Sequence, residues 1–164
     1  MPDGRDDFEA FVAARYAALL RTAYLLTGHH QDAEDLLQQT LVKAVGAWRR
    51  IEGDPEPYVR TILVRQNVSR WRHRRWRELS ADVLPEVRVV AEGVEDRLAL
   101  HRALGVLAPR QRAVIVLRYY EDLTEAETAR ALGVAVGTVK SQARDALRRL
   151  REAWPELAEE LVSL

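Results

Sequence analysis

The chain of 164 residues contains no cysteine, one methionine and no apolar run of membrane-spanning length. Without cysteine there can be no disulfide framework and no thiolate metal site. A membrane-spanning helix needs roughly 20 apolar residues. The charged residues 3–9 also lack the basic-then-apolar order of a secretory signal. We therefore expect a cytoplasmic protein that does not insert into a membrane.

Four histidines remain as possible imidazole ligands for a metal. The best case for an enzyme is a metal site formed by His29, His30, Asp32 and Glu34, but their spacing is poor and they lie where two helices are expected to join. The sequence also offers no nucleophile motif, phosphate-binding loop or paired-carboxylate arrangement. We therefore expect no enzymatic activity, no catalytic residues, no metal and no cofactor.

Positive and negative residues are equal in number, 25 of each, but they are separated along the chain. Seven arginines and no acid lie between residues 60 and 77, and five basic residues with one acid lie between residues 140 and 151. Residues 79–94, between these stretches, have neither helical nor alternating periodicity. We therefore expect two small domains, residues 1–78 and 95–164, joined by a linker and each carrying a positive surface.

The first domain is predicted to consist of three helices. Residues 8–26 place apolar side chains three and four apart, and the pattern ends at Gly28. Residues 32–51 repeat this periodicity after an acidic start, which suits a helix N-terminus. Glycine and proline in residues 53–57 favour a loop, and residues 58–78 form a third helix. The apolar positions expected to face the core in the first two helices are Phe8, Phe11, Val12, Tyr16, Leu19, Leu20, Ala23, Leu26, Ala33, Leu36, Leu37, Leu41, Ala44, Val45 and Trp48.

Arginines occur on all sides of the end of the third helix instead of on one face. Successive residues lie about 100° apart around a helix, so a core cannot cover all of Arg70, Arg72, Arg74, Arg75 and Arg77. One interpretation is a solvated helix end, whose cations suit the helix dipole. The other is a phosphate-binding surface on which Trp71 and Trp76 stack unpaired bases. This helix alone leaves both interpretations open.

The second domain contains the signals of a helix-turn-helix. A helix over residues 95–107 is followed by Pro109, which suits the first position of the next helix. Thr124 and Glu127 form a capping box, and Gly133 suits the left-handed turn before a further helix. The expected apolar stripe of that helix is Val136, Val139, Ala143, Leu147 and Leu150, which leaves outside Gly137, Thr138, Ser141, Arg144, Asp145 and Arg148. A helix of this kind lies in a DNA major groove, although an unrelated helical hairpin is the alternative.

Three stretches in this order resemble the bacterial group 4, or extracytoplasmic function (ECF), RNA polymerase sigma factors, especially the SigE-like actinobacterial type. They are "AYLLTGHHQDAEDLLQQTL", the Arg/Trp-rich helix, and "PRQRAVIVLRYYEDLTEAETARALGVAVGTVKSQ". The resemblance covers nearly the whole chain. It implies an all-α protein with a sigma-2-like domain and a sigma-4-like helix-turn-helix domain that ends in a short C-terminal tail. It also implies an alternative sigma factor that binds core polymerase, recognises promoter minus-35 and minus-10 elements and promotes DNA melting.

The resemblance further implies three sets of contact residues. Those for core polymerase are Asp32, Glu34, Asp35, Leu36, Gln38, Gln39 and Lys43, for which a solvated acidic helix start is the alternative. Those for the minus-10 element are Tyr58, Arg60, Arg65, Asn67, Arg70, Trp71 and Arg74, of which Tyr58 and Trp71 are equally compatible with core positions. Those for the minus-35 element are Thr138, Lys140, Ser141, Gln142, Arg144 and Arg148.

The chain departs from the family pattern at four positions. Asp145 and Gln39 stand where arginine and glutamate are common, and His101 replaces a common aromatic residue. Thr128 occupies a slot usually filled by isoleucine, and we expect its hydroxyl to bond back to a backbone carbonyl.

The implied partners are the RNA polymerase core, at its clamp and flap regions, and promoter DNA in double-stranded and melted form. The resemblance also suggests sequestration by an anti-sigma factor, although no residue identifies one. The main alternative is a stand-alone helix-turn-helix transcriptional regulator that does not join polymerase. A second Arg/Trp-rich helix and an acidic docking helix argue against that alternative.

Overall fold

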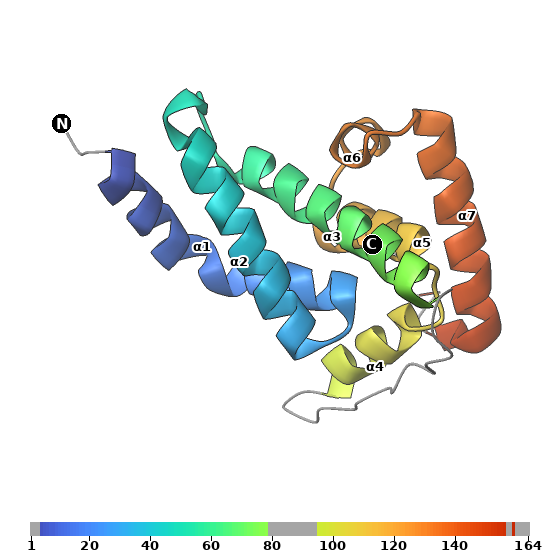
Figure 1. Cartoon of the computed structure of the whole chain (residues 1–164). Helices are drawn as coiled ribbons and strands as arrows, with labels where there is room; N and C mark the ends of the chain where they lie inside the picture. Colours follow the sequence, from blue (N-terminus) through green and yellow to red (C-terminus); the bar gives the residue numbers. More distant parts are fainter. Residues whose placement is uncertain (1–3, 79–94, 157–158, 160–164) are drawn as a thin grey trace. The chain divides into compact units, whose positions relative to one another are not determined.

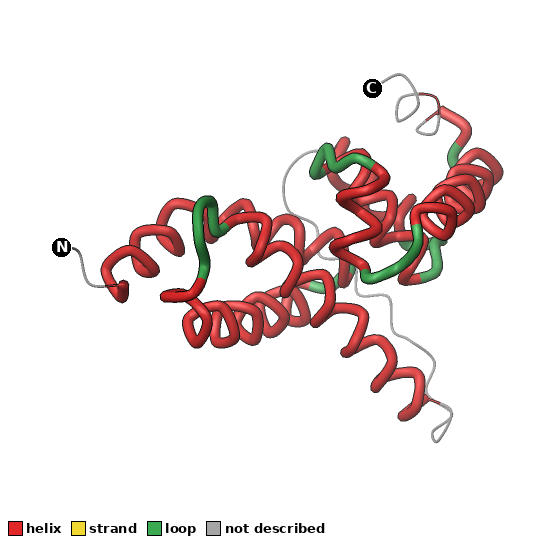
Figure 2. The backbone as a smooth tube through the Cα atoms, turned by 90° about the horizontal axis from the view of Figure 1, so that it is seen from above, coloured by secondary structure: helices red, strands yellow, loops and turns green. Residues whose placement is uncertain are grey.

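A computed structural model describes residues 4–78, 95–156 and 159, and every regular element in this part of the chain is helical (Figures 1 and 2). Side chains are described up to His73 and from Leu100 onward. The chain divides into two compact units at Asn67 and Val68, and each is described by itself. The predicted linker, residues 79–94, and most of the C-terminal tail lie outside the described residues, so the predicted domain boundaries stay predictions.

The first unit begins with a helical hairpin. Helices α1 (Gly4–Thr27) and α2 (His30–Ala47) pack side by side in opposite directions (Figure 1). The turn between them needs Gly28, whose φ of 78° is in the left-handed region that favours glycine. Its N–H donates to the Tyr24 carbonyl at 2.8 Å and closes α1. The helix end predicted at Gly28 is therefore confirmed.

Apolar side chains from three helices are buried in the first unit. They are Leu19, Ala23, Leu25 and Leu26 of α1, Ala33, Leu36, Leu37 and Ala44 of α2, and Val59, Leu63 and Val64 of α3. Two predicted core positions are wrong, because Tyr16 and Val45 are exposed. Trp48 follows α2 and packs against Phe8 and Phe11, with ring centroids 5.0 and 5.1 Å apart. These aromatic contacts attach the end of α2 to the start of α1.

Helix α3 (Glu56–Glu78) starts after a short loop that follows the single turn η1 (Trp48–Arg50). Gly53 has a φ of 77°, and the Asp54 carboxylate accepts a 3.0 Å hydrogen bond from the backbone N–H of Glu56. That bond satisfies one of the N–H groups that every helix start leaves unpaired. The predicted loop is confirmed, and the helix begins two residues before the predicted start at residue 58.

The second unit contains helices α4 (Glu95–Leu104), α5 (Pro109–Ile115), α6 (Glu125–Leu132) and α7 (Val136–Ala153). Pro109 is the first residue of α5, as predicted. Arg112 of α5 donates from Nε to the Leu104 carbonyl at the end of α4, at 3.0 Å. Burial lowers the pKa of the Arg112 guanidinium, and this hydrogen bond offsets part of the cost of removing the charge from water.

A wide turn that the sequence did not predict follows α5. Residues Val116–Tyr120 (η2) form a π-type turn in which the Glu121 N–H donates to the Val116 carbonyl, five residues back, at 3.0 Å. Asp122 then has a φ of 56°, and Arg118 donates to the Leu123 carbonyl. These contacts redirect the chain from the buried α5–η2 segment to the start of α6.

Candidate nucleic-acid interface

Helix α6 begins with the capping box that the sequence predicts. The Glu127 N–H donates to the Thr124 hydroxyl at 3.1 Å, and the Thr124 N–H donates to the Glu127 carboxylate at 2.8 Å. Each of these side chains satisfies a backbone donor that lacks a partner within the helix. The box therefore fixes the first turn of α6.

The turn between α6 and α7 is built around Gly133, whose φ is 67°. The Val134 N–H donates to the Ala129 carbonyl at 3.0 Å, and the Gly133 N–H donates to the Arg130 carbonyl at 3.3 Å. This pattern is the Schellman motif that commonly ends helices. A Cβ at Gly133 would meet nothing within 4 Å, so glycine is favoured here for its backbone conformation and not for lack of space.

The inner face of α7 packs against a small core made by Val114 of α5, Ala129 of α6 and Val139 of α7. The predicted stripe is right at Val139 and Leu150, which are both fully buried. It is wrong at Val136, which is 40% exposed, and it omitted Ala146, which is fully buried. The buried face therefore follows positions 139, 146 and 150, with Ala143 packed against the same core.

The hydroxyl of Thr128 does not behave as predicted. Thr128 is fully buried on α6, and its Oγ1 has no hydrogen-bond partner among the residues that the structure describes. The expected bond back to a carbonyl is therefore absent from the described structure. A buried hydroxyl without a partner costs about 1–3 kcal/mol, so this position weakens the packing of α6.

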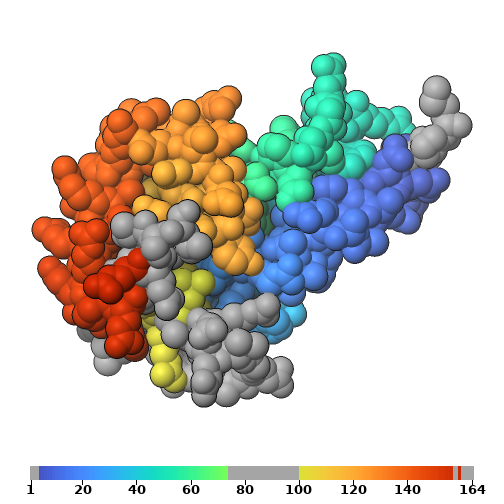
Figure 3. All heavy atoms as spheres, turned by 180° about the vertical axis from the view of Figure 1, so that it is seen from behind, coloured from blue at the N-terminus to red at the C-terminus, as the bar shows by residue number. Residues whose placement is uncertain are grey.

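The outer face of α7 carries the six residues predicted for the minus-35 element. Lys140, Arg144 and Arg148 are exposed, and because they are spaced four residues apart they lie along one side of the helix. Thr138, Ser141 and Gln142 are half-buried beside them. The Ser141 hydroxyl donates to the Thr138 carbonyl at 3.0 Å. Figure 3 shows α6 and α7, in orange to red, at the surface of the second unit.

Two of these basic side chains have exposed acidic neighbours. The Lys140 Nζ lies 3.8 Å from the Glu125 carboxylate, and the Arg148 guanidinium lies 3.9 Å from the Asp145 carboxylate. Exposed pairs of this kind contribute about 0–1 kcal/mol. A phosphate group can therefore compete with both acids for these two cations.

The start of α7 is open to a ligand. Ala135 precedes the helix and provides no side-chain cap for its first N–H groups. A Cβ at Gly137 would meet nothing within 4 Å, so the backbone there is uncovered. Together with the basic face along α7, these groups form a surface that suits phosphate and base edges.

The seven minus-10 candidates on α3 differ in accessibility. Tyr58 is 44% exposed, which rules out the core position left open for it, and Arg65 is exposed too. Arg70 and Trp71 are half-buried, and Asn67 is buried. The side chain of Arg74 lies outside the described residues.

Arg60, the remaining candidate, belongs to an ionic cluster that the sequence did not predict. The Glu56 carboxylate pairs with Arg15 of α1, and Arg60 Nη2 lies 3.5 Å from the same oxygen. Arg15 lies 41 residues before Glu56 in the sequence, so no local pattern could have indicated the cluster. Only the i, i+4 spacing of Glu56 and Arg60 was visible in the sequence.

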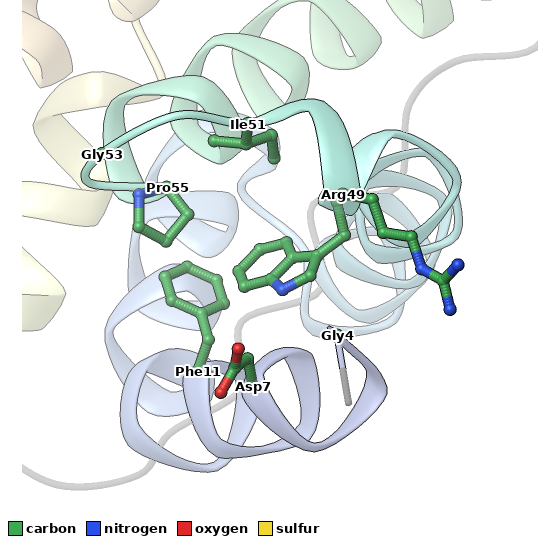
Figure 4. A pocket seen from close by; sticks show the side chains of 8 residues that line it. Gly4, Asp7, Phe11, Arg49, Ile51, Gly53 and Pro55 are labelled. Carbon is green, nitrogen blue, oxygen red and sulfur yellow. The ribbon is translucent and has the colours of Figure 1, made fainter. Parts of the chain in front are cut away.

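An open hollow of about 440 Å³ lies behind the loop that precedes α3 (Figure 4). Phe11 and Trp48 form part of its wall, and Ile51 and Pro55 of the loop lie across from α1. The Arg49 side chain points away from the hollow. The hollow therefore lies between the loop and the first turns of α1.

The polymerase-contact candidates on α2 are mostly at the surface. Asp35, Gln38, Gln39 and Lys43 are exposed, and Asp32 and Glu34 are half-buried. Leu36 is fully buried in the core of the first unit, so we leave it out of the contact set. Val42 and Val45, which the sequence did not place among the contacts, are exposed on the same helix.

The residues considered for a metal site do not gather around a common point. The His30 Nε2 lies 3.3 Å from the Glu34 carboxylate, as expected for residues four apart on one helix. Within the described ranges, no group of three or more histidine, aspartate or glutamate side chains is arranged to hold a metal ion.

Residues 11–77 match Sigma-70 region 2, and residues 97–150 match Sigma-70, region 4. The RNA polymerase sigma-E factor of Streptomyces coelicolor is 42% identical over 150 residues, which are 89% of this chain and 85% of that protein. The ECF RNA polymerase sigma factor SigL of Mycobacterium tuberculosis is 35% identical over 153 residues, which are 86% of this chain and 85% of that protein. The chain belongs to the ECF family of RNA polymerase sigma factors.

Two solved structures resemble this sigma factor. The sigma factor RpoE of Bartonella quintana, in complex with the anti-sigma factor NepR, matches with a TM-score of 0.76 and 29% identity, over 89% of this chain and 95% of that one. CnrH, in complex with the cytosolic domain of CnrY, matches with a TM-score of 0.64 and 23% identity, over 93% and 89% of the two chains, which supports the fold. No helix in the described part of this sigma factor is long and apolar enough to cross a membrane.

Proposed function

We propose that this sigma factor binds core RNA polymerase, directs it to promoters with minus-35 and minus-10 elements, and promotes strand separation between them. The observation that carries the proposal is the basic outer face of α7, which has an open helix start and belongs to the match with sigma region 4. The region 2 match contains the other two sets of candidate residues.

Helix α7 reads the minus-35 element in duplex DNA. Its first turns enter the major groove, where Thr138, Ser141 and Gln142 exchange hydrogen bonds with base edges. Lys140, Arg144 and Arg148 bind phosphates or guanine. Asp145 lies on the same side of the helix and accepts from cytosine or repels phosphate.

Helix α3 receives the minus-10 element as its strands separate. Unstacking a base step costs a few kcal/mol, and stacking a base on an aromatic side chain returns about 1–3 kcal/mol. Tyr58 is exposed and Trp71 half-exposed, so both have ring surface available for a base. Arg65 and Arg70 lie farther along the helix, where they hold the backbone of the separated strand.

Helix α2 docks on the clamp of the polymerase core. Its exposed side chains include both apolar and polar groups, as protein interfaces usually do. They are Asp35, Gln38, Gln39, Val42, Lys43 and Val45. The second unit contacts the flap region, and the complex acts in the cytoplasm.

An anti-sigma factor is the proposed regulator. The related RpoE was crystallised with the anti-sigma factor NepR, and the structure of CnrH is of its complex with the cytosolic domain of CnrY. A bound inhibitor that covers α2 or α7 would prevent the contacts with polymerase or DNA described above. Both helices have exposed faces that such a partner can cover.

The direct test is transcription by purified core polymerase, with and without this protein, on a pool of genomic promoter fragments. We expect transcript starts that appear only with the protein and share two spaced sequence elements. DNA binding without new transcript starts would instead support a stand-alone helix-turn-helix regulator.

A matched pair of variants tests the role of α7 in the same assay. Arg144→Ala removes an exposed cation from the proposed DNA-binding side, and Arg110→Ala removes an exposed cation from α5, outside that helix. Arg144→Ala should lower affinity for the minus-35 duplex about tenfold, because one base or phosphate contact is worth roughly 1–3 kcal/mol. Equal losses in the two variants would contradict the assigned face.

A further inference from the structure

We infer that Glu56 is a positioning residue for the minus-10 element: it holds the loop over residues 51–55 and the first turn of α3 in the arrangement that receives melted DNA. This inference rests on the proposed function. It concerns residues of the first unit only, and Glu56 itself is not proposed to touch DNA.

Glu56 contacts arginines from two helices. Its carboxylate pairs with the guanidinium of Arg15, which comes from α1, and the same oxygen lies 3.5 Å from Nη2 of Arg60, one turn along α3. The side chains of Glu56 and Arg60 are only 22% and 17% exposed. One carboxylate therefore pairs with two guanidinium groups and connects the start of α3 to α1.

Partial burial makes this connection stronger than a surface ion pair. Charges removed from water interact over an effective dielectric constant well below that of bulk solvent. The Arg15 side chain is 40% exposed, so its pair with Glu56 is only partly buried, but removal of the carboxylate would leave two arginines near each other. Arg15 also has a buried Nε without a hydrogen-bond partner in the described part of the chain, and its Nη2 donates to the Glu56 carboxylate.

The same residue also fixes the loop. The backbone N–H of Glu56 donates to Asp54 at 3.0 Å, and the Val59 N–H donates to the Pro55 carbonyl at 3.0 Å. On the side facing α1 the loop borders the open hollow (Figure 4). The connection through Glu56 and Arg15 adds a restraint at the end of the loop, where α3 begins.

Loss of this connection should affect the minus-10 element selectively. Tyr58, the exposed aromatic residue proposed to stack a base, comes two positions after Glu56. A shift of the first turn of α3 therefore moves Tyr58 relative to the strand it receives. Arg60, which the sequence places among the DNA contacts, is instead assigned here to the connection that holds α3.

The test uses full-length Glu56→Gln, Arg15→Met and the double variant with core polymerase. The substrates are two promoter libraries, one randomised at the minus-10 element and one at the minus-35 element. We expect Glu56→Gln and Arg15→Met each to slow open-complex formation about fivefold and to change the minus-10 base preference, with minus-35 preference unchanged. Because residues in contact act together, the double variant should form open complexes at a rate within about twofold of the slower single variant.

Two further variants separate positioning from other effects. Glu9→Gln removes the same charge from an exposed residue of α1, outside the loop, and it should transcribe like the wild type. Arg15→Lys keeps the positive charge and should recover open-complex formation to within about threefold of the wild type. Thermal unfolding of each variant sets an assay temperature at which all are folded.

Three results would overturn the inference. The first is a minus-10 preference and opening rate for Glu56→Gln within twofold of the wild type, whatever its thermal stability. The second is an equal change in the two libraries, and the third is an equal defect in Glu9→Gln. Failure of the wild type itself to direct transcription would instead reject the proposed function, and the inference with it.

Discussion

Replacing Thr128 with valine should stabilise the second unit. Valine has nearly the shape of threonine, so it keeps the buried methyl group and replaces the hydroxyl whose Oγ1 has no partner among the described residues. The two residues also have similar intrinsic helix propensities. The substitution therefore isolates one quantity, the free energy of burying an unsatisfied hydroxyl.

The magnitude follows from burial at this site. Thr128 is fully buried beside Ala129, which packs with Val114 and Val139. An unsatisfied hydroxyl costs about 1–3 kcal/mol, so Thr128→Val should raise the free energy of unfolding by about 1–2 kcal/mol. For a unit of this size, each kcal/mol raises the Tm by about 4–8 °C.

Hydrogen exchange measured by mass spectrometry on the full chain can assign the gain to the right unit. Peptides from α5, α6 and α7 should exchange more slowly in Thr128→Val, while peptides from α1 and α2 remain unchanged. Thr128→Ser is the control, because it keeps the hydroxyl, loses a buried methyl and should lower stability by about 1 kcal/mol. A Thr128→Val protein no more stable than the wild type would refute the reasoning, since it would mean that the hydroxyl is hydrogen-bonded in solution.

Further substitutions test the local geometry and the DNA-binding face. Thr124→Ala breaks the capping box and should cost about 0.5–2 kcal/mol, seen as faster amide exchange in α6. Gly133→Ala should cost about 1–2 kcal/mol in thermal unfolding, because its φ of 67° is unfavourable for alanine although the site has room for a Cβ. Leu36→Ala should cost about 2–5 kcal/mol in urea unfolding, as expected for a fully buried leucine and not for a surface contact. Lys140→Ala should reduce the salt dependence of minus-35 duplex binding by about one unit of log K against log salt, measured by titration at several salt concentrations.

The helices and their ends could be predicted wherever a local rule determines them. Gly28, Pro109, Thr124 and Gly133 each mark a boundary through backbone conformation or capping, and the structure confirms all four. The turn at Val116–Tyr120 was missed because it interrupts a continuous apolar run, in which a change from an α-helical to a wider turn leaves no pattern.

Burial was harder to predict because hydrophobicity and packing are different properties. Ala146 is small enough to be compatible with either face of α7, and only the position of α5 and α6 shows that it is buried. Val136 is apolar but lies in the first turn, where it remains exposed.

Leu36 was predicted both as a core position and as a polymerase contact, and its full burial confirms the first of these predictions. The cluster around Glu56 depends on Arg15, 41 residues away, and needed the fold to bring the two together.

The hydrogen bond from Arg112 to the Leu104 carbonyl has a mechanical consequence. It ties the last turn of α4 to the first turns of α5, whose Val114 shares a core with α6 and α7. A displacement of the end of α4 is therefore coupled, through one hydrogen bond and a shared apolar core, to the helix proposed to read DNA.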